Sequence, residues 1–157
     1  MPLRRTAVAA LASALLACST APRAPAVAAT SPDVTAVLAE ADAALGLAQF
    51  EVAGARYEEA ARLAPKDPRP LLGLARVRLA AAQAAEGLAL LDRSIALGAT
   101  PEALILRGRT LGVARRFDDA ARDLERGLAL APGDGSAWPI LAAIQVNRGD
   151  ELAARRA

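Results

Sequence analysis

The sixteen residues FEVAGARYEEAARLAP (residues 50–65) return in similar form as FDDAARDLERGLALAP (residues 117–132). Both stretches begin with phenylalanine, have alanine three residues later and end with proline. The eighth place holds a large residue, Tyr57 or Leu124, and the residue three places further on is small. The two stretches are therefore copies of one sequence unit.

A third copy lies between the first two. The stretch AAEGLALLDRSIALGA (residues 84–99) has Gly87 where the others have alanine, Leu91 at the large place and Ser94 at the small one. The three copies recur with a period of about 34 residues. A period of this length is typical of stacked pairs of secondary-structure elements.

The composition predicts that these elements are helices. Hydrophobic residues make up 54% of the 157 residues, mainly as alanine and leucine, with two Phe, one Tyr and one Trp. Alanine and leucine favour helices, whereas strands are rich in β-branched and aromatic residues. Asp67-Pro68 and Thr100-Pro101 each place a capping side chain before a proline at the first helical position. We therefore expect an all-α chain with helices that begin near these prolines.

The repeated pattern resembles the tetratricopeptide repeat, a helix–turn–helix unit whose small residues let paired helices approach closely. The resemblance covers residues 34–157 and implies a solenoid of three full repeats and a partial fourth, in a right-handed superhelical stack. We place the units near residues 34–67, 68–100, 101–134 and 135–157. The last unit has Trp138 where the family often has tryptophan, and we expect a turn at residues 148–150 before a short final helix.

The first 17 residues have the pattern of a secretory signal peptide. Arg4 and Arg5 precede an apolar run at residues 7–16. This run is too short to span a membrane, because a spanning helix needs about 20 apolar residues. The chain has 19 basic and 17 acidic side chains, so it is formally neutral without this segment. The basic surplus belongs to the signal, and a nucleic-acid partner is not supported.

The end of the signal, Leu15-Leu16-Ala17-Cys18, resembles the lipobox of bacterial lipoprotein precursors. The resemblance implies that the signal is removed before Cys18 and that fatty chains such as palmitate anchor this residue in a membrane. Residues 18–33 would then be the lipidated cysteine and a flexible Ala/Pro-rich tether. The alternative is that Cys18 is an ordinary residue of a signal peptide that is cut elsewhere.

The residue after the cysteine bears on the membrane in question. In the lipoprotein family, aspartate at this place tends to retain the protein at the inner membrane, and this chain has Ser19 there. The resemblance therefore implies a location in the cell envelope, at the outer membrane and facing the periplasm.

The sequence offers none of the common catalytic arrangements. It contains no histidine, and Cys18 is its single cysteine, which excludes Ser-His-Asp and Cys-His sites and the usual His/Cys zinc site. Glu58-Glu59 and Asp118-Asp119 are neighbours in sequence and do not share one helix face, which predicts a solvated surface. We expect no enzyme activity, no cofactor and no metal.

Two further features have structural interpretations. The stretch GDGS (residues 133–136) lacks the acids of a calcium loop and the Gly-Lys of a phosphate loop, so we expect a turn between units, with Ser136 capping the next helix. The four aromatic residues of the chain fall at packing positions of the repeat. We predict that they belong to the core: Phe50, Tyr57, Phe117 and Trp138.

A binding surface remains as the candidate site. In tetratricopeptide proteins the first helices of successive units line a concave groove. By this resemblance the groove residues are Arg69, Leu72, Arg76 and Leu79 in the second unit and Glu102, Ile105, Arg109 and Val113 in the third. Residues 68–116 hold eight arginines and three acidic residues, so we expect the middle of the groove to be positive.

Arg76 and Arg109 occupy equivalent places in their units. Guanidinium groups make forked, charge-assisted hydrogen bonds to carboxylates. We therefore hypothesise that the two arginines grip a carboxylate-terminated or acidic segment of an envelope protein or peptide. The alternative is that they are solvated or paired with Glu102 and similar acids.

Three functions are compatible with these features. The first is a lipid-anchored scaffold for protein–protein interaction in the bacterial cell envelope. The second is a piloting chaperone that carries one client, such as a pore or pilus subunit, to the outer membrane. The third is a cell-wall-binding protein or an enzyme whose site the sequence does not reveal.

Overall fold

The computed structural model describes residues 33–154, with side chains as far as Gly149. This part of the chain contains seven α-helices and no strand, which confirms the all-α prediction. None of these helices is both long enough and apolar enough to cross a bilayer. The predicted signal, Cys18 and the tether up to residue 32 lie outside the described residues. The helices are α1 (Val34–Gly46), α2 (Phe50–Leu63), α3 (Arg69–Ala80), α4 (Ala84–Leu97), α5 (Pro101–Val113), α6 (Phe117–Leu130) and α7 (Ala137–Ala154).

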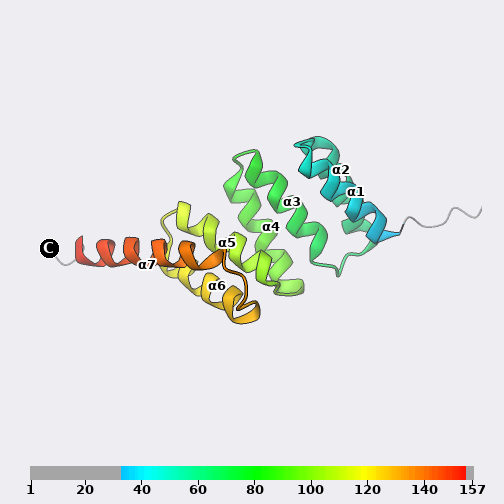
Figure 1. Cartoon of the computed structure of the whole chain (residues 1–157). Helices are drawn as coiled ribbons and strands as arrows, with labels where there is room; N and C mark the ends of the chain where they lie inside the picture. The colour runs from blue at the N-terminus through cyan, green and yellow to red at the C-terminus, as the bar shows by residue number, and fades with distance from the viewer. Residues whose placement is uncertain (1–32, 155–157) are drawn as a thin grey trace, which may run out of the picture. The chain divides into compact units, whose positions relative to one another are not determined.

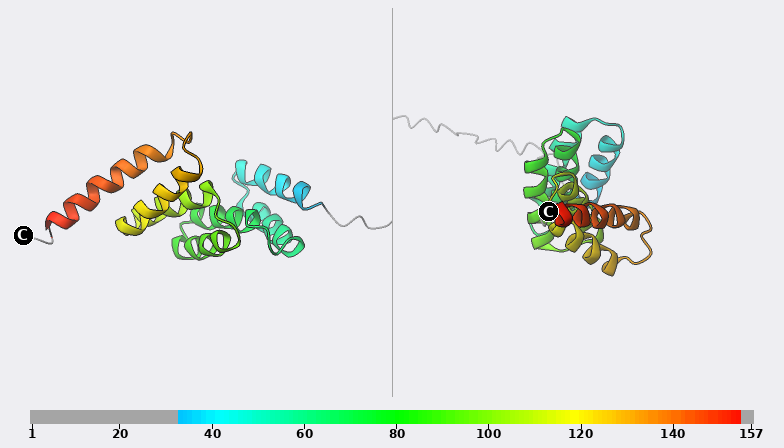
Figure 2. Two further views of the ribbon diagram at one scale, coloured as in Figure 1. Left: turned by 90° about the horizontal axis from the view of Figure 1, so that it is seen from below. Right: turned by 90° about the vertical axis from the view of Figure 1, so that its left-hand side faces the viewer.

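The helices form successive pairs along one stack (Figure 1). Helix α1 packs on α2, α3 on α4 and α5 on α6, and the second helix of each pair also contacts the first helix of the next. First helices touch one another as well, α1 with α3 and α5 with α7. Figure 2 shows this order from two other sides. The described residues therefore form a helical-repeat solenoid in which α7 is the first helix of a fourth unit.

The turn inside each pair has the same backbone form. Ala48, Ala82 and Arg115 have φ angles of 56°, 60° and 59°, in the left-handed region. In the second unit the N–H of Gln83 donates to the carbonyl oxygen of Arg78 over 2.9 Å, and the other two turns have the same bond. This bond is typical of a Schellman motif, in which glycine usually takes the left-handed position. Ala48, Ala82 and Arg115 carry a Cβ atom that glycine lacks, so the backbone of these three residues is strained.

The helix starts agree with the predicted caps in two places. Thr100 accepts the N–H of Ala103 over 3.2 Å and caps α5. Asp67 accepts the N–H of Arg69, the first residue of α3, over 2.9 Å. Pro68 stands just before α3, rather than at the first helical position as predicted. Short polar side chains at these boundaries thus satisfy helix N–H groups that lack an intrahelical partner.

The fourth unit differs from the prediction. Helix α7 continues through residues 148–150, so the predicted turn is wrong there. In the first three units the turn is followed by a helix of 14 residues that buries apolar side chains. A continuous helix keeps the backbone hydrogen bonds that a turn at residues 148–150 would break. The predicted cap is also wrong: no N–H of the described residues donates to the Oγ of Ser136, and this hydroxyl donates instead to Oδ1 of Asp134 over 2.6 Å.

Three apolar clusters fill the stack. The first joins α1, α2 and α3, the second joins α3, α4 and α5, and the third joins α5, α6 and α7. Leu91 and Leu124, which stand at the large place of the repeat, are both 0% exposed. Each helix pair is thus covered by the next one, as a solenoid requires.

The aromatic residues are divided between core and surface. Tyr57 is 1% exposed and Phe117 is 6% exposed, as predicted. Phe50 is 37% exposed and Trp138 is 54% exposed, so the prediction that they belong to the core is wrong. Phe117 packs in the cluster that α7 completes, whereas Phe50 lies outside the cluster of the first three helices. Trp138 is exposed because the described residues contain no second helix of the fourth unit to cover it.

Candidate functional site

Two adjoining hollows lie along the first helices of the units. The larger, of about 690 Å³, is lined by α3, by α5 and by residues of the turn before α7. The smaller, of about 150 Å³, is lined by α1, α2 and α3 and by Glu102 of α5. Arg76 and Glu102 line both hollows, so we treat them as one surface, the groove. Its lining residues are Leu38, Asp42, Tyr57, Arg69, Leu72, Gly73, Arg76, Thr100, Pro101, Glu102, Ile105, Leu106, Arg109, Asp134 and Ser136.

Most of the residues predicted to face the groove line it. These are Arg69, Leu72, Arg76, Glu102, Ile105 and Arg109. Leu79 does not, because it packs against the cluster that contains Leu91. Val113 does not either; it is the last residue of α5 and is 85% exposed. The structure therefore brings together the six residues in the first part and middle of α3 and α5, and it leaves the two residues nearest the turns outside the groove.

The two equivalent arginines differ in their partners. Arg76 on α3 forms an ion pair with Glu102 on α5, which is the pairing that the sequence left open. Arg109 is exposed and makes no ion pair with any residue whose side chain is described. Within the groove, Arg109 is thus the arginine that has no carboxylate partner among the described side chains.

The groove is less positive than the count of charges predicts. Five of the eight arginines in residues 68–116 have a carboxylate partner, namely Arg69, Arg76, Arg78, Arg107 and Arg116. Some partners lie outside that range of residues. Asp67, for example, pairs with Arg69 over 2.6 Å, and the hydrogen bond from this guanidinium holds the pKa of the carboxyl below its ordinary value. A count within one segment misses such partners, and the free positive charge of the groove is concentrated at Arg109.

The sequence analysis did not predict that an aspartate lies at each end of the groove, Asp42 at one end and Asp134 at the other. The phenol Oη of Tyr57 donates to Oδ1 of Asp42 over 2.5 Å. Burial, together with this bond, raises the pKa of Tyr57, so the phenol remains a donor at ordinary pH. Asp42 has the same repeat position as Arg76 and Arg109. Its place in the groove could therefore have been predicted from the repeat register. Asp134 lines the other end from the turn before α7; it is the last residue of the third unit, as Asp67 and Thr100 are of the first two.

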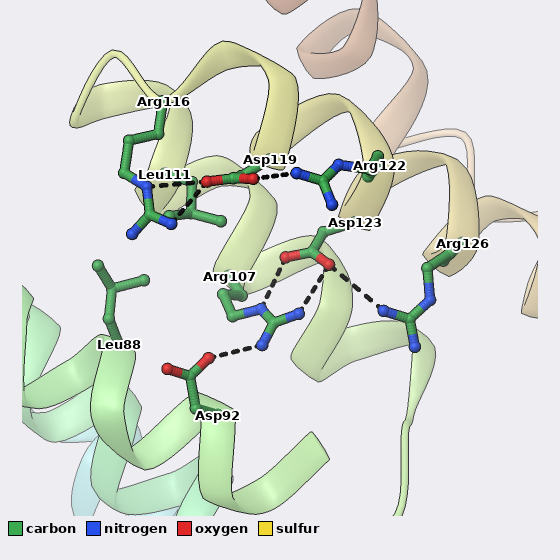
Figure 3. Close-up of a pocket in the computed structure, with 9 residues that line it drawn as sticks. All are labelled: Leu88, Asp92, Arg107, Leu111, Arg116, Asp119, Arg122, Asp123 and Arg126. Carbon is green, nitrogen blue, oxygen red and sulfur yellow. Dashed lines mark hydrogen bonds and ion pairs between the residues drawn. The ribbon is translucent and has the colours of Figure 1, made fainter. Parts of the chain in front are cut away.

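A separate hollow of about 300 Å³ lies between α4, α5 and α6 (Figure 3). At its centre, Arg107 donates from Nε and Nη2 to the two carboxylate oxygens of Asp123, over 2.6 Å and 2.8 Å. The third donor, Nη1, reaches Oδ1 of Asp92 over 2.6 Å. The side chains of Arg107 and Asp123 are only 18% and 6% exposed. We call this hollow the arginine pocket; it is lined by Leu88, Asp92, Arg107, Leu111, Arg116, Asp119, Arg122, Asp123 and Arg126.

The hydrogen bonds to Asp123 in particular raise the pKa of Arg107, so this cation is permanent. No spacing in the sequence singled out the arginine pocket, because its members come from three helices. Among the side chains that the structure describes, no acidic group has the arrangement that would hold a metal ion.

No family model matches the chain, and no curated protein matches it. Solved structures do resemble it. The first tetratricopeptide domain of Spaghetti (RPAP3), bound to the HSP90 peptide SRMEEVD, superposes with a TM-score of 0.72 at 18% identity, over 76% of this chain and 98% of that one. YrrB, a tetratricopeptide protein with an unusual peptide-binding site, gives a TM-score of 0.67 at 19% identity, over 74% of this chain and 61% of that one.

The Sgt2 tetratricopeptide domain from Aspergillus fumigatus superposes with a TM-score of 0.66 at 19% identity, over 80% of this chain and 83% of that one. At these identities the likeness concerns the fold. Together with the three stacked helix pairs, it shows that residues 33–154 have the fold of a tetratricopeptide repeat domain.

Proposed function

We propose that this protein is a lipid-anchored scaffold of the bacterial cell envelope that binds a segment of a partner protein in the groove. The observation that carries the proposal is the position of Arg109, a cation without an ion pair among the described side chains, beside the apolar surface of Ile105 and Leu106. Such a site offers one strong anchor for a carboxylate and an apolar surface for an apolar side chain.

The two peptide-binding structures support this type of ligand. The HSP90 peptide bound by Spaghetti, SRMEEVD, is acidic near its C-terminus, and YrrB has a peptide-binding site. In our chain the ligand carboxylate would lie in the middle of the groove, on Arg109. Asp42 and Asp134 at the two ends disfavour further negative charge there. The preferred segment therefore has one acidic group or a C-terminal carboxylate next to an apolar residue.

Arg76 has a different role from the one that its repeat position suggested. Its guanidinium is held by Glu102, so a ligand carboxylate must displace that side chain before it can use Arg76. The side chain of Glu102 is 58% exposed, which makes the exchange feasible but weakens the net gain. Arg109 is accordingly the main anchor.

The membrane anchor is the second part of the proposal. The lipobox-like sequence at Cys18 and the Ala/Pro-rich residues that follow it support a tethered domain at the outer membrane, facing the periplasm. A tether of this kind keeps the groove at the membrane while it searches for a partner.

The test is crosslinking and affinity purification of the full chain from its own envelope, beside three variants. Arg109→Ala removes the anchor of the groove, and Cys18→Ser removes the lipid site. Arg93→Ala is the matched control, because this exposed arginine on α4 does not line the groove. We expect one or two envelope proteins to be recovered with the full chain and with Arg93→Ala, and to be lost with Arg109→Ala.

Two outcomes would change the proposal. Recovery of the same proteins with Arg109→Ala would show that the groove does not bind them. A client that is recovered with Cys18→Ser but no longer reaches the outer membrane would favour the piloting chaperone over the fixed scaffold.

Binding of short peptides by fluorescence anisotropy tests the ligand class. Peptides with a free C-terminal carboxylate are expected to bind about tenfold more tightly than the same peptides with an amide end. Equal affinities for the two forms would contradict the role of Arg109.

A further inference from the structure

The arginine pocket has more positive charge than its own carboxylates neutralise. Four arginines, Arg107, Arg116, Arg122 and Arg126, face three aspartates across the pocket (Figure 3). The arginines come from α5, from the turn before α6 and from α6 itself, so their guanidinium groups approach from different directions. The side chains that line the pocket therefore carry a net charge of +1.

Several donors of these guanidinium groups have no acceptor among the described residues. Arg116 uses Nε and Nη2 on Asp119, at 3.0 Å and 2.6 Å, and keeps Nη1. Arg122 also uses Nη2 on Asp119, while its Nε reaches the carbonyl oxygen of Asp118 over 3.4 Å. Its Nη1 is kept as well. A guanidinium has five N–H groups, so the pocket retains donors that can bind an incoming anion.

The three aspartates are not held equally. Asp119 is held by Arg116 and Arg122, and Asp123 by Arg107 and Arg126. Asp92 has a single hydrogen bond, to Nη1 of Arg107, and its side chain is 63% exposed. Asp92 is therefore the carboxylate that an incoming anion would displace.

Displacement of Asp92 changes the charge that the ligand meets. Four guanidinium groups then face only the two carboxylates of Asp119 and Asp123. The resulting surplus of two positive charges matches a phosphate monoester, which carries about −1.5 to −2 at neutral pH. Its three terminal oxygens spread in different directions and suit donors from two helices, whereas a planar carboxylate suits one guanidinium fork.

We propose that the arginine pocket binds a phosphate group. The hollow of about 300 Å³ has room for a phosphate and part of the molecule that bears it. Leu88 and Leu111 line the same hollow and offer apolar contact to that organic part. The phosphate belongs either to a soluble phosphate compound or to a lipid headgroup, and these two sources share the same chemistry at the pocket.

The site is independent of the groove. Arg107 and Arg109 are two residues apart on α5, which corresponds to a rotation of about 200° around the helix. One therefore lines the pocket and the other lines the groove, on opposite sides of α5. A phosphate ligand and a partner peptide can be bound at the same time.

Isothermal titration of the full chain with inorganic phosphate, and separately with diphosphate, tests the proposal. The double variant Arg116→Ala/Arg122→Ala is expected to bind at least tenfold more weakly, because it removes two of the arginines that keep unused donors. Asp92→Asn is expected to bind several-fold more tightly, because it removes the competing carboxylate. Arg93→Ala, outside both the pocket and the groove, is expected to bind like the unaltered chain.

The source of the phosphate is tested by flotation with vesicles of phosphatidylcholine, with and without phosphatidate, using the Cys18→Ser variant so that no lipid anchor contributes. Recruitment that needs phosphatidate and both arginines identifies a headgroup, and binding of soluble phosphate alone identifies a soluble ligand. Absence of any binding up to about 10 mM phosphate and diphosphate, with no recruitment to phosphatidate, would overturn the proposal. Equal binding by the double arginine variant and the unaltered chain would overturn it as well.

Discussion

Replacement of Gly73 by alanine is expected to destabilise the protein by about 2 kcal/mol. Gly73 lies on α3 opposite Tyr57 of α2, and a Cβ there would come within 3.0 Å of three atoms of the tyrosine ring. The ring cannot move aside, since Tyr57 is 1% exposed and its hydroxyl is bound to Asp42. Overpacking costs about 1–3 kcal/mol, and the helix preference of alanine returns about 0.5–1 kcal/mol. An overlap with a fixed ring belongs to the upper part of that range.

Urea unfolding followed by far-UV circular dichroism measures this effect. Gly46→Ala is the control, because Gly46 ends α1 and a Cβ there meets nothing within 4 Å. This control is expected to be more stable by about 0.5 kcal/mol, from backbone preference alone. The two substitutions are chemically identical, so the difference between them isolates the contact with Tyr57.

A double variant tests the cause directly. Tyr57→Leu introduces the residue that the second and third units have at this place, Leu91 and Leu124. Combined with Gly73→Ala, it is expected to be less destabilised than the sum of the single variants by at least about 1 kcal/mol. Strict additivity, or a Gly73→Ala variant with the urea midpoint of the unaltered chain, would refute the overlap.

Three further changes have expected outcomes. Asp123→Ala should cost about 3 kcal/mol in urea unfolding, because it leaves the mostly buried guanidinium of Arg107 without its main partner, whereas Asp123→Leu combined with Arg107→Met should cost less. Ala82→Gly should stabilise the chain by about 0.5–1 kcal/mol and raise its melting temperature, because φ is 60° at this turn. The hydrogen bond from Arg116 lowers the pKa of Asp119, so the stability from this pair is complete above the ordinary carboxyl range and is lost as pH falls through the lowered value. Asp119→Asn should therefore flatten the fall of stability below about pH 4, measured by urea unfolding at a series of pH values.

The groove shows how far repeat register can place a site. Arg76 and Arg109 were found because they occupy one position of the repeat, and both line the groove. Register does not say what lies across from each of them. Arg76 meets Glu102 of the next first helix, and the ring of Tyr57 requires Gly73 in the same way. Contacts between units depend on the residues that neighbouring units happen to present, so they must be seen in space.

The sequence by itself determined that the chain is a stack of helix pairs, because the fold of a repeat is set by local preferences and by spacing. The spacing of large and small residues around Leu91 and Leu124 is one such local pattern, and the cap that Thr100 forms on α5 is another. The tertiary structure alone decided three other features: the exposure of Trp138, the unbroken course of α7 and the arginine pocket around Arg107. Each of these depends on which helices are present to cover, oppose or neutralise a side chain. Such long-range relations leave no periodic trace in the sequence.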